Sequence, residues 1–187
     1  IPKSDSLGIF FSGLSMSVTP GKMGELLKCY ILKKIKGTPI SVSTSIIFAE
    51  RITDFISLII IAVIGAYIIG YGREISVSFG ILFLLLVFVI SSRKISLKIL
   101  TIFEKIGFLN KFVKSIHNLY EGIYVLVKIK PLLFAVFISL IGWFCECYGF
   151  YLALEAFSTH FKILSASFIY AFSTLVGAIL FLPGGLG

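Results

Sequence analysis

Charged residues are scarce in this sequence: they make up 14% of its 187 positions, whereas a soluble domain carries about 25%. Cysteine is also scarce. The three cysteines, Cys29, Cys145 and Cys147, stand in apolar surroundings and are too few for an extracellular disulfide framework. No Walker-type loop, nucleophile elbow, HExxH motif or dinucleotide fingerprint occurs, so nothing supports a catalytic nucleophile or a cofactor. These absences argue against a soluble enzyme and against a disulfide-stabilised secreted domain.

Apolar residues are in excess, at 58% of the chain, with a mean hydropathy of +1.05. Three stretches of bilayer length, residues 55–72, 75–92 and 163–187, contain no Asp, Glu, Lys or Arg. We therefore predict an all-α fold, a polytopic transmembrane helix bundle of about four or five spans with broken or re-entrant helices. Residues 1–187 are expected to form a single transmembrane domain. Because the chain starts at Ile1 rather than Met, this domain is expected to be part of a longer protein.

The basic residues indicate how the chain is threaded. Of the 17 Lys and Arg residues, five lie in residues 22–36 and eight in residues 93–130. Short Lys-rich segments resist translocation and are attracted to anionic lipid, so both segments are expected on the cytoplasmic side. The predicted path then runs inward over residues 7–19, outward over 41–72, inward over 75–92, outward over 131–156 and inward over 163–182. Residues 7–19 are shorter than the roughly 20 residues of a span, so a truncated span and a re-entrant hairpin both remain open.

Residues 93–130 form a basic amphipathic segment. Apolar residues recur from Ile95 to Ile123 at alternating steps of four and three, with lysines on the other faces. This pattern predicts a helix lying on the inner head-group layer or packed under the bundle. A structural connector is the default interpretation, and a lipid-surface sensor is the functional alternative. Nucleic-acid binding is not expected, because these lysines lie beside spanning helices and no base-stacking motif accompanies them.

Residues 19–25 form a candidate anion site, composed of Thr19, Pro20, Gly21, Lys22, Met23, Gly24 and Glu25. Pro20 suits the first turn of a helix, and the two glycines let a ligand approach the backbone. Unpaired amides at a helix start favour an anion, and Lys22 adds a positive charge. Glu25 is expected in the first turn of the helix that follows. The plainer alternative is that Pro-Gly only turns the chain at the membrane surface.

The same Pro-Gly-x-x-Gly pattern recurs at the end of the chain, in the order Leu182, Pro183, Gly184, Gly185, Leu186 and Gly187. Paired Gly/Pro interruptions point to a transport site built from broken helices whose ends face a cavity. We predict that the two turns meet within the bilayer and present bare amides to a negatively charged lipid. A parallel and an inverted repeat both remain open.

A third set of residues carries charge next to or within apolar runs. Glu50, Arg51 and Asp54 lead into the uncharged run from Phe55, and Glu146 is the deepest charge of the chain. Such charges normally face the bundle interior or water. We expect Arg51 to pair with a carboxylate or a lipid phosphate and the acids to line a polar pathway for the head group. An ordinary interfacial cluster at a helix end is the alternative for residues 50–54.

No metal site is predicted. Cys145, Glu146 and Cys147 are consecutive, so on a helix they splay over different faces. His117 and His160 are isolated and are expected to be surface residues.

Three motifs occur in the order Thr19-Pro-Gly-Lys-x-Gly-Glu25, Phe48-Ala-Glu-Arg-Ile-Thr-Asp54 and Leu182-Pro-Gly-Gly-Leu-Gly187. In this order the sequence resembles the flippase-like family of the lysylphosphatidylglycerol synthase transmembrane region, over nearly the whole chain. The resemblance implies translocation of phospholipids or polyprenyl-linked glycolipids across the cytoplasmic membrane, or a membrane part that serves an appended transferase. The family usually has an acidic residue after the last motif, where this chain ends.

The expected partners follow from the anion sites and the resemblance. They are membrane lipids, either anionic phospholipid or a polyprenyl-phosphate lipid, with a second copy of the chain or a soluble transferase as further candidates. The leading hypothesis is a multi-pass flippase of the cell membrane. The alternatives are the membrane part of a glycosyl- or aminoacyl-transferase, and a scaffold that recruits a soluble enzyme through the stripe from Ile95 to Ile123.

Overall fold

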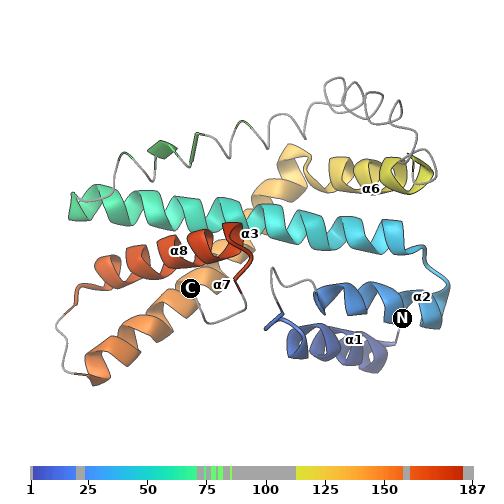
Figure 1. Ribbon diagram of the computed structural model, residues 1–187, viewed down its shortest axis with the longest axis horizontal. Coiled ribbons are helices and arrows are strands. Elements are labelled where there is room, and N and C mark those ends of the chain that lie inside the picture. Colours follow the sequence, from blue (N-terminus) through green and yellow to red (C-terminus); the bar gives the residue numbers. More distant parts are fainter. Residues whose placement is uncertain are drawn as a thin grey trace. The chain divides into compact units, whose positions relative to one another are not determined.

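The computed structural model describes residues 2–19, 24–70, 113–157 and 161–182, and a few positions between 74 and 85. Every element in these ranges is a helix: α1 (Lys3–Ser15), α2 (Leu27–Lys36), α3 (Ile40–Ile69), α6 (Val113–Leu126), α7 (Ile129–Ala156) and α8 (Ile163–Ile179), shown in Figure 1. The predicted all-α fold is confirmed. The chain divides into two compact units, and each is described by itself.

Within the described ranges, two helices are long and apolar enough to cross a membrane. α3 has 30 residues and α7 has 28. At 1.5 Å per residue each exceeds the roughly 30 Å of a hydrocarbon core. Their bounds agree within a few residues with the predicted spans 41–72 and 131–156, because uncharged runs of bilayer length mark such helices clearly. α8 is a shorter apolar helix of 17 residues.

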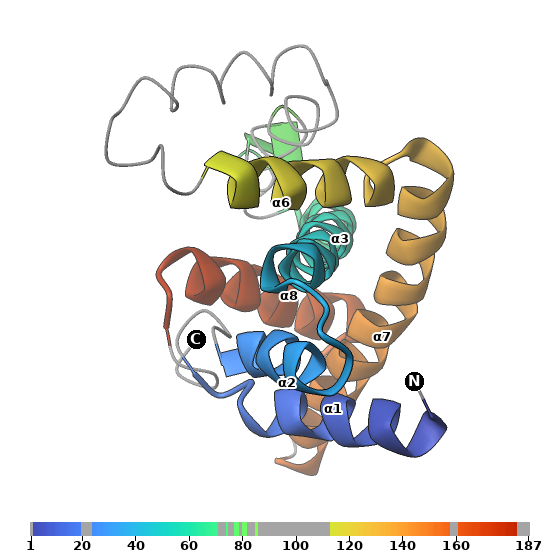
Figure 2. The same ribbon diagram turned by 90° about the vertical axis from the view of Figure 1, so that its right-hand side faces the viewer.

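The other predicted spans and the basic segment are described only in part. Most of residues 75–92 and of the basic segment 93–130 lie outside the described residues. The span predicted over 75–92 and most of the amphipathic stripe from Ile95 to Ile123 therefore stay predictions. α1 has 13 residues. Its length of about 20 Å is less than a hydrocarbon core. Instead of extending, α1 packs against α2 as a helical hairpin, which Figure 2 shows from the side.

The first unit holds α1, α2, α3 up to Ala49, and α6. Glycines allow its helices to pack closely at two places. A Cβ added at Gly13 of α1 would lie 2.0 Å from Cε of Lys28, so the lysine side chain crosses α1 where α1 has no side chain. A Cβ at Gly122 of α6 would lie 2.2 Å from Oγ of Ser45 on α3. Small residues at helix contacts allow such close packing in membrane proteins.

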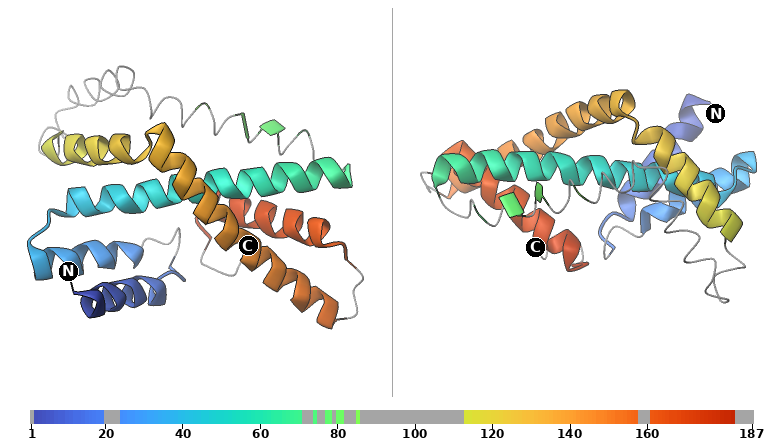
Figure 3. Two further views of the ribbon diagram at one scale, coloured as in Figure 1. Left: turned by 180° about the vertical axis from the view of Figure 1, so that it is seen from behind. Right: turned by 90° about the horizontal axis from the view of Figure 1, so that it is seen from above.

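The second unit holds α3 from Glu50, α7, and α8 up to Gly177. Figure 3 shows these helices from behind and from above. Leu58 and Ala62 of α3 pack with Ala171 and Leu175 of α8 in a buried cluster. A Cβ at Gly65 would lie 2.7 Å from Cβ of Phe168, so α3 and α8 are in close contact. This packing positions the polar residues of α3 and α8 that are described below.

Candidate functional site

The charged residues 50–54 lie in the interior of a helix. Asp54 comes fourteen residues after the start of α3 at Ile40 and fifteen before its end at Ile69. The helix continues because residues 40–49 contain no glycine or proline to break it. The alternative interpretation, an interfacial cluster at a helix end, is therefore wrong, and these charges need partners from neighbouring helices or from a polar surrounding.

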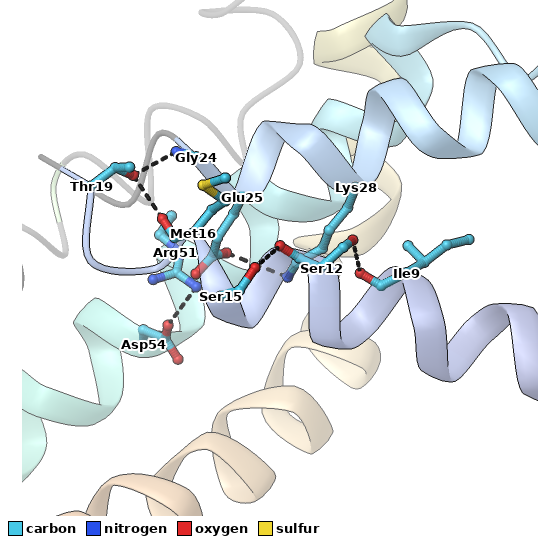
Figure 4. Close-up of polar contacts among 10 residues, drawn as sticks. All are labelled: Ile9, Ser12, Ser15, Met16, Thr19, Gly24, Glu25, Lys28, Arg51 and Asp54. Carbon is cyan, nitrogen blue, oxygen red and sulfur yellow. Dashed lines mark hydrogen bonds and ion pairs between the residues drawn. The ribbon is translucent and has the colours of Figure 1, made fainter.

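Asp54 is the centre of a polar cluster that joins α3 to α7. Its Oδ1 accepts hydrogen bonds from Ser139 Oγ at 2.9 Å and from Trp143 Nε1 at 3.1 Å. Its Oδ2 lies 3.3 Å from a guanidinium nitrogen of Arg51, an ion pair marked in Figure 4. Four residues separate Ser139 from Trp143, so both point from one face of α7. The predicted pairing of Arg51 with a carboxylate is present, and the carboxylate is that of Asp54.

Glu146 continues the same face of α7, three residues after Trp143. Its Oε2 accepts a hydrogen bond of 2.5 Å from the hydroxyl of Tyr170 on α8. The Tyr170 ring lies 6.5 Å from the Trp143 ring and 5.5 Å from the Phe150 ring, measured between centroids. Three aromatic rings and one exposed carboxylate therefore gather at this place.

Trp143 connects the two polar groups. Its indole N–H donates to Asp54, and its ring lies beside that of Tyr170, which donates to Glu146. The order along this line is Arg51, Asp54, Trp143, Tyr170 and Glu146. The line runs through three helices of one compact unit. The sequence indicated four residues of these helices as partners of a lipid head group. Three of them, Arg51, Asp54 and Glu146, lie on this line.

Glu50 is the fourth of those residues, and it is exposed. It lies one turn before Asp54 on α3. Ser57, one turn after, is fully buried and donates to the backbone carbonyls of Thr53 at 2.9 Å and Val136 at 3.3 Å. Polar groups thus recur along α3 from the exposed Glu50 to the buried contact of Ser57 with α7.

The first Pro-Gly motif is described only at its two ends. Thr19 Oγ1 accepts a hydrogen bond from the Gly24 amide at 2.7 Å and donates one to the Met16 carbonyl at 2.8 Å, as Figure 4 shows. A Cβ at Gly24 would lie 2.6 Å from the Met16 carbonyl oxygen, so only glycine fits there without a shift. One hydroxyl thus ties the end of α1 to the turn that leads into α2.

Glu25 lies in a 3₁₀ turn, residues 24–26, directly before α2. It is 6% exposed, and its Oε2 lies 3.4 Å from Nζ of Lys28. The sequence predicted Glu25 near the start of this helix, where a negative charge is favourable. The ion pair with Lys28 was missed, although their spacing of three residues is one at which helical side chains meet.

The rest of the predicted anion sites lies outside the described residues. This applies to Pro20, Gly21 and Lys22 of the first motif and to Pro183, Gly184, Gly185 and Gly187 of the second. The meeting of the two turns therefore stays a prediction. The second motif is described only at Leu182, which is exposed.

Apolar helices of bilayer length, with a few charges that have polar partners on neighbouring residues, are typical of an integral membrane protein. The family model of the lysylphosphatidylglycerol synthase transmembrane region matches residues 1–187, so the chain is an integral membrane protein of this family. It is also similar to the UPF0104 membrane protein MJ1078 of Methanocaldococcus jannaschii. The two are 28% identical over 176 residues, which cover 91% of this chain and 73% of the relative. No solved structure matches the chain. The resemblance drawn from the three motifs is confirmed.

Proposed function

We propose that this protein is a multi-pass flippase of the cytoplasmic membrane, which moves the head groups of phospholipids or polyprenyl-linked glycolipids across the bilayer. The observation that carries the proposal is the line of polar side chains from Arg51 to Glu146 within α3, α7 and α8. A head group that leaves water for hydrocarbon loses its hydrogen bonds at a cost of several kcal/mol per group. Polar side chains arrayed along apolar helices lower that cost by supplying replacement partners.

Arg51 is the proposed partner of the lipid phosphate. A guanidinium has five donors in a planar fork, so Arg51 is able to keep Asp54 while it binds phosphate oxygens. Asp54 in turn is fixed by Ser139 and Trp143 on the opposite oxygen. Asp54 therefore serves to hold Arg51 in a defined orientation.

Glu146 is the proposed partner of the cationic part of a zwitterionic head group. Its carboxylate is exposed, and the rings of Trp143, Phe150 and Tyr170 gather beside it. Aromatic faces attract ammonium groups, and the attraction grows when water is excluded. A phosphate at Arg51 and an ammonium near Glu146 match the two charges of such a head group.

The turn at residues 19–25 is the proposed second phosphate site, with Lys22 as its charge. Support comes from the bond between Thr19 and Gly24, which fixes the two ends of the motif side by side. In this proposal α1 and α2 form a re-entrant hairpin that carries the turn into the bilayer. The glycines at 184, 185 and 187 would complement it from the second motif.

Translocation of head-group-labelled phospholipid in proteoliposomes tests the proposal. Lys22→Gln and Arg51→Gln are each expected to slow translocation about tenfold or more, since a hydrogen bond to a charged group is worth about 1.5–3 kcal/mol. Lys162→Gln, which removes an exposed lysine just before α8, is the matched control and should leave the rate unchanged. Unchanged transport in both site variants would remove the site assignment. A native rate equal to that of protein-free vesicles would remove the function itself.

A further inference from the structure

The end of α2 carries an exposed cluster of basic and aromatic side chains. Lys33, Lys34 and Lys36 occupy its last turn, and all three are exposed. The Nζ of Lys34 lies over the ring of Tyr30, 5.2 Å from its centroid. Tyr30 is itself 49% exposed. We call Tyr30, Lys33, Lys34 and Lys36 the α2 basic patch.

A sharp change from charged to apolar surface follows the α2 basic patch. Gly37 ends α2 in a left-handed conformation with φ of 69°, and its amide donates to the Lys33 carbonyl at 2.8 Å. Three residues later α3 begins, and its exposed side chains are apolar: Ile40, Val42, Ile46 and Phe48. α3 is long and apolar enough to span a membrane. The boundary between charged and apolar surface therefore falls at the corner between α2 and α3.

α2 and the start of α3 run side by side from this corner. The hydroxyl of Thr44 donates to the sulfur of Cys29 at 3.7 Å, and Cys29 is buried. Tyr30 lies about 9 Å along α2 from Lys36, at 1.5 Å per residue. This spacing suits a tyrosine at the interface between head groups and hydrocarbon, with the lysines on the water side of it.

We propose that the α2 basic patch binds anionic phospholipids of the leaflet that α3 enters, as lipids that are retained and not transported. Three exposed ammonium groups in the last turn of α2 complement the negative charge of that surface. Each such lysine strengthens attachment to an anionic leaflet by about fivefold. The hydroxyl end of Tyr30 completes the contact with the polar head-group layer. The patch thereby fixes the depth of the corner between α2 and α3.

The inference is independent of the proposed transport route, because it uses none of the residues assigned there. Lipid binding at the α2 basic patch would also affect the depth of the Thr19–Gly24 turn. Gly24 precedes Lys36 by twelve residues, a length of about 18 Å at 1.5 Å per residue, so with the lysines at the head groups it is able to reach into the hydrocarbon core. A bound anionic lipid would then hold the Thr19–Gly24 turn at its working depth.

Photocrosslinking in vesicles tests the proposal. The full chain is placed in vesicles of phosphatidylcholine and phosphatidylglycerol with a photoactivatable probe of either lipid, and crosslinks are mapped to the peptide containing residues 30–42. The native protein is expected to favour the phosphatidylglycerol probe there. The combined change Lys33→Gln, Lys34→Gln and Lys36→Gln should remove that preference, a loss of up to about 100-fold in affinity.

The control is the triple Lys→Arg variant at the same positions, which keeps the charges and should keep the preference. Equal preference in the native and triple-glutamine proteins overturns the proposal, and so does an equal loss in the arginine variant. Circular dichroism of each variant establishes that α2 remains helical. Translocation assays on the same vesicles separate the two proposals, since Lys22→Gln and Arg51→Gln should slow transport without changing crosslinking at residues 30–42.

Discussion

Tyr170 of α8 donates a hydrogen bond of 2.5 Å to Glu146 of α7, and its ring lies between those of Trp143 and Phe150 in a group of three aromatic side chains. A carboxylate in an apolar helix is costly unless polar groups surround it. Tyr170 supplies such a group from a neighbouring helix. Tyr170 therefore both supplies a partner to Glu146 and links α8 to α7.

Tyr170→Phe removes the donor and keeps the ring. The free energy of unfolding is expected to fall by about 1–3 kcal/mol, the cost of leaving a polar group without its partner. Thermal unfolding in detergent measures the change. Tyr148→Phe is the control, since Tyr148 is exposed on α7 and donates no hydrogen bond within the described part of the chain. A Tyr170→Phe protein as stable as the control would show that this bond contributes nothing.

The contacts of Asp54 with α7 predict energetic coupling between the two helices. Ser139→Ala and Asp54→Ala should be non-additive, with an interaction energy of about 0.5–3 kcal/mol, because both changes remove the hydrogen bond from the Ser139 hydroxyl to the Asp54 carboxylate. A double-mutant cycle on the free energy of unfolding measures it. Ser173→Ala supplies the comparison, since the Ser173 hydroxyl bonds to the carbonyl of Ile169 in its own helix. Strict additivity of the Ser139 and Asp54 changes would contradict the geometry.

Gly65 lies at a close contact between α3 and α8. In Gly65→Ala the new Cβ would meet the Phe168 Cβ at 2.7 Å and the Leu164 carbonyl oxygen at 3.2 Å. Overpacking of this kind is expected to destabilise the protein by about 1–3 kcal/mol. Gly142→Ala makes the same change where nothing lies within 4 Å. It should be neutral or stabilising by about 0.5–1 kcal/mol, so equal effects of the two changes on thermal unfolding would contradict the packing.

The Thr19 hydroxyl ties α1 to the turn before α2. Thr19→Val keeps the shape of the side chain but removes both hydrogen bonds, so the free energy of unfolding should fall by about 1–2 kcal/mol, as for a lost helix cap. The Gly24 amide should also exchange faster with deuterium. Thr19→Ser keeps the hydroxyl and should keep slow exchange. If the valine and serine proteins exchange alike, the hydroxyl does not protect this amide.

The long helices could be predicted from the sequence because uncharged runs of bilayer length are a local signal. Residues 41–72 and 131–156 were expected, and α3 and α7 are Ile40–Ile69 and Ile129–Ala156. The alternative of a helix end at residues 50–54 was wrong, because charged residues do not by themselves end a helix. α3 continues through the charges because a second helix supplies donors to Asp54.

The partners in the polar cluster could not be predicted from local patterns. Ser139 and Trp143 lie 85 and 89 positions from Asp54 in the sequence. Tyr170 lies 24 positions from Glu146. The sequence does indicate that Ser139, Trp143 and Glu146 share one face of a helix, because they recur at steps of four and three. That spacing indicates a polar face but not which helix meets it.

Head-group translocation by the Glu146→Gln variant tests the central claim most directly. The change keeps the size of the side chain and an oxygen for Tyr170 but removes the negative charge. Glu155→Gln makes the same change in the last turn of α7 and is the control. In proteoliposomes with a head-group-labelled zwitterionic lipid, we expect Glu146→Gln to translocate about tenfold more slowly, the loss of one charged partner, while Glu155→Gln keeps the native rate. A Glu146→Gln protein that folds normally and translocates at the native rate would contradict a head-group path along α3, α7 and α8.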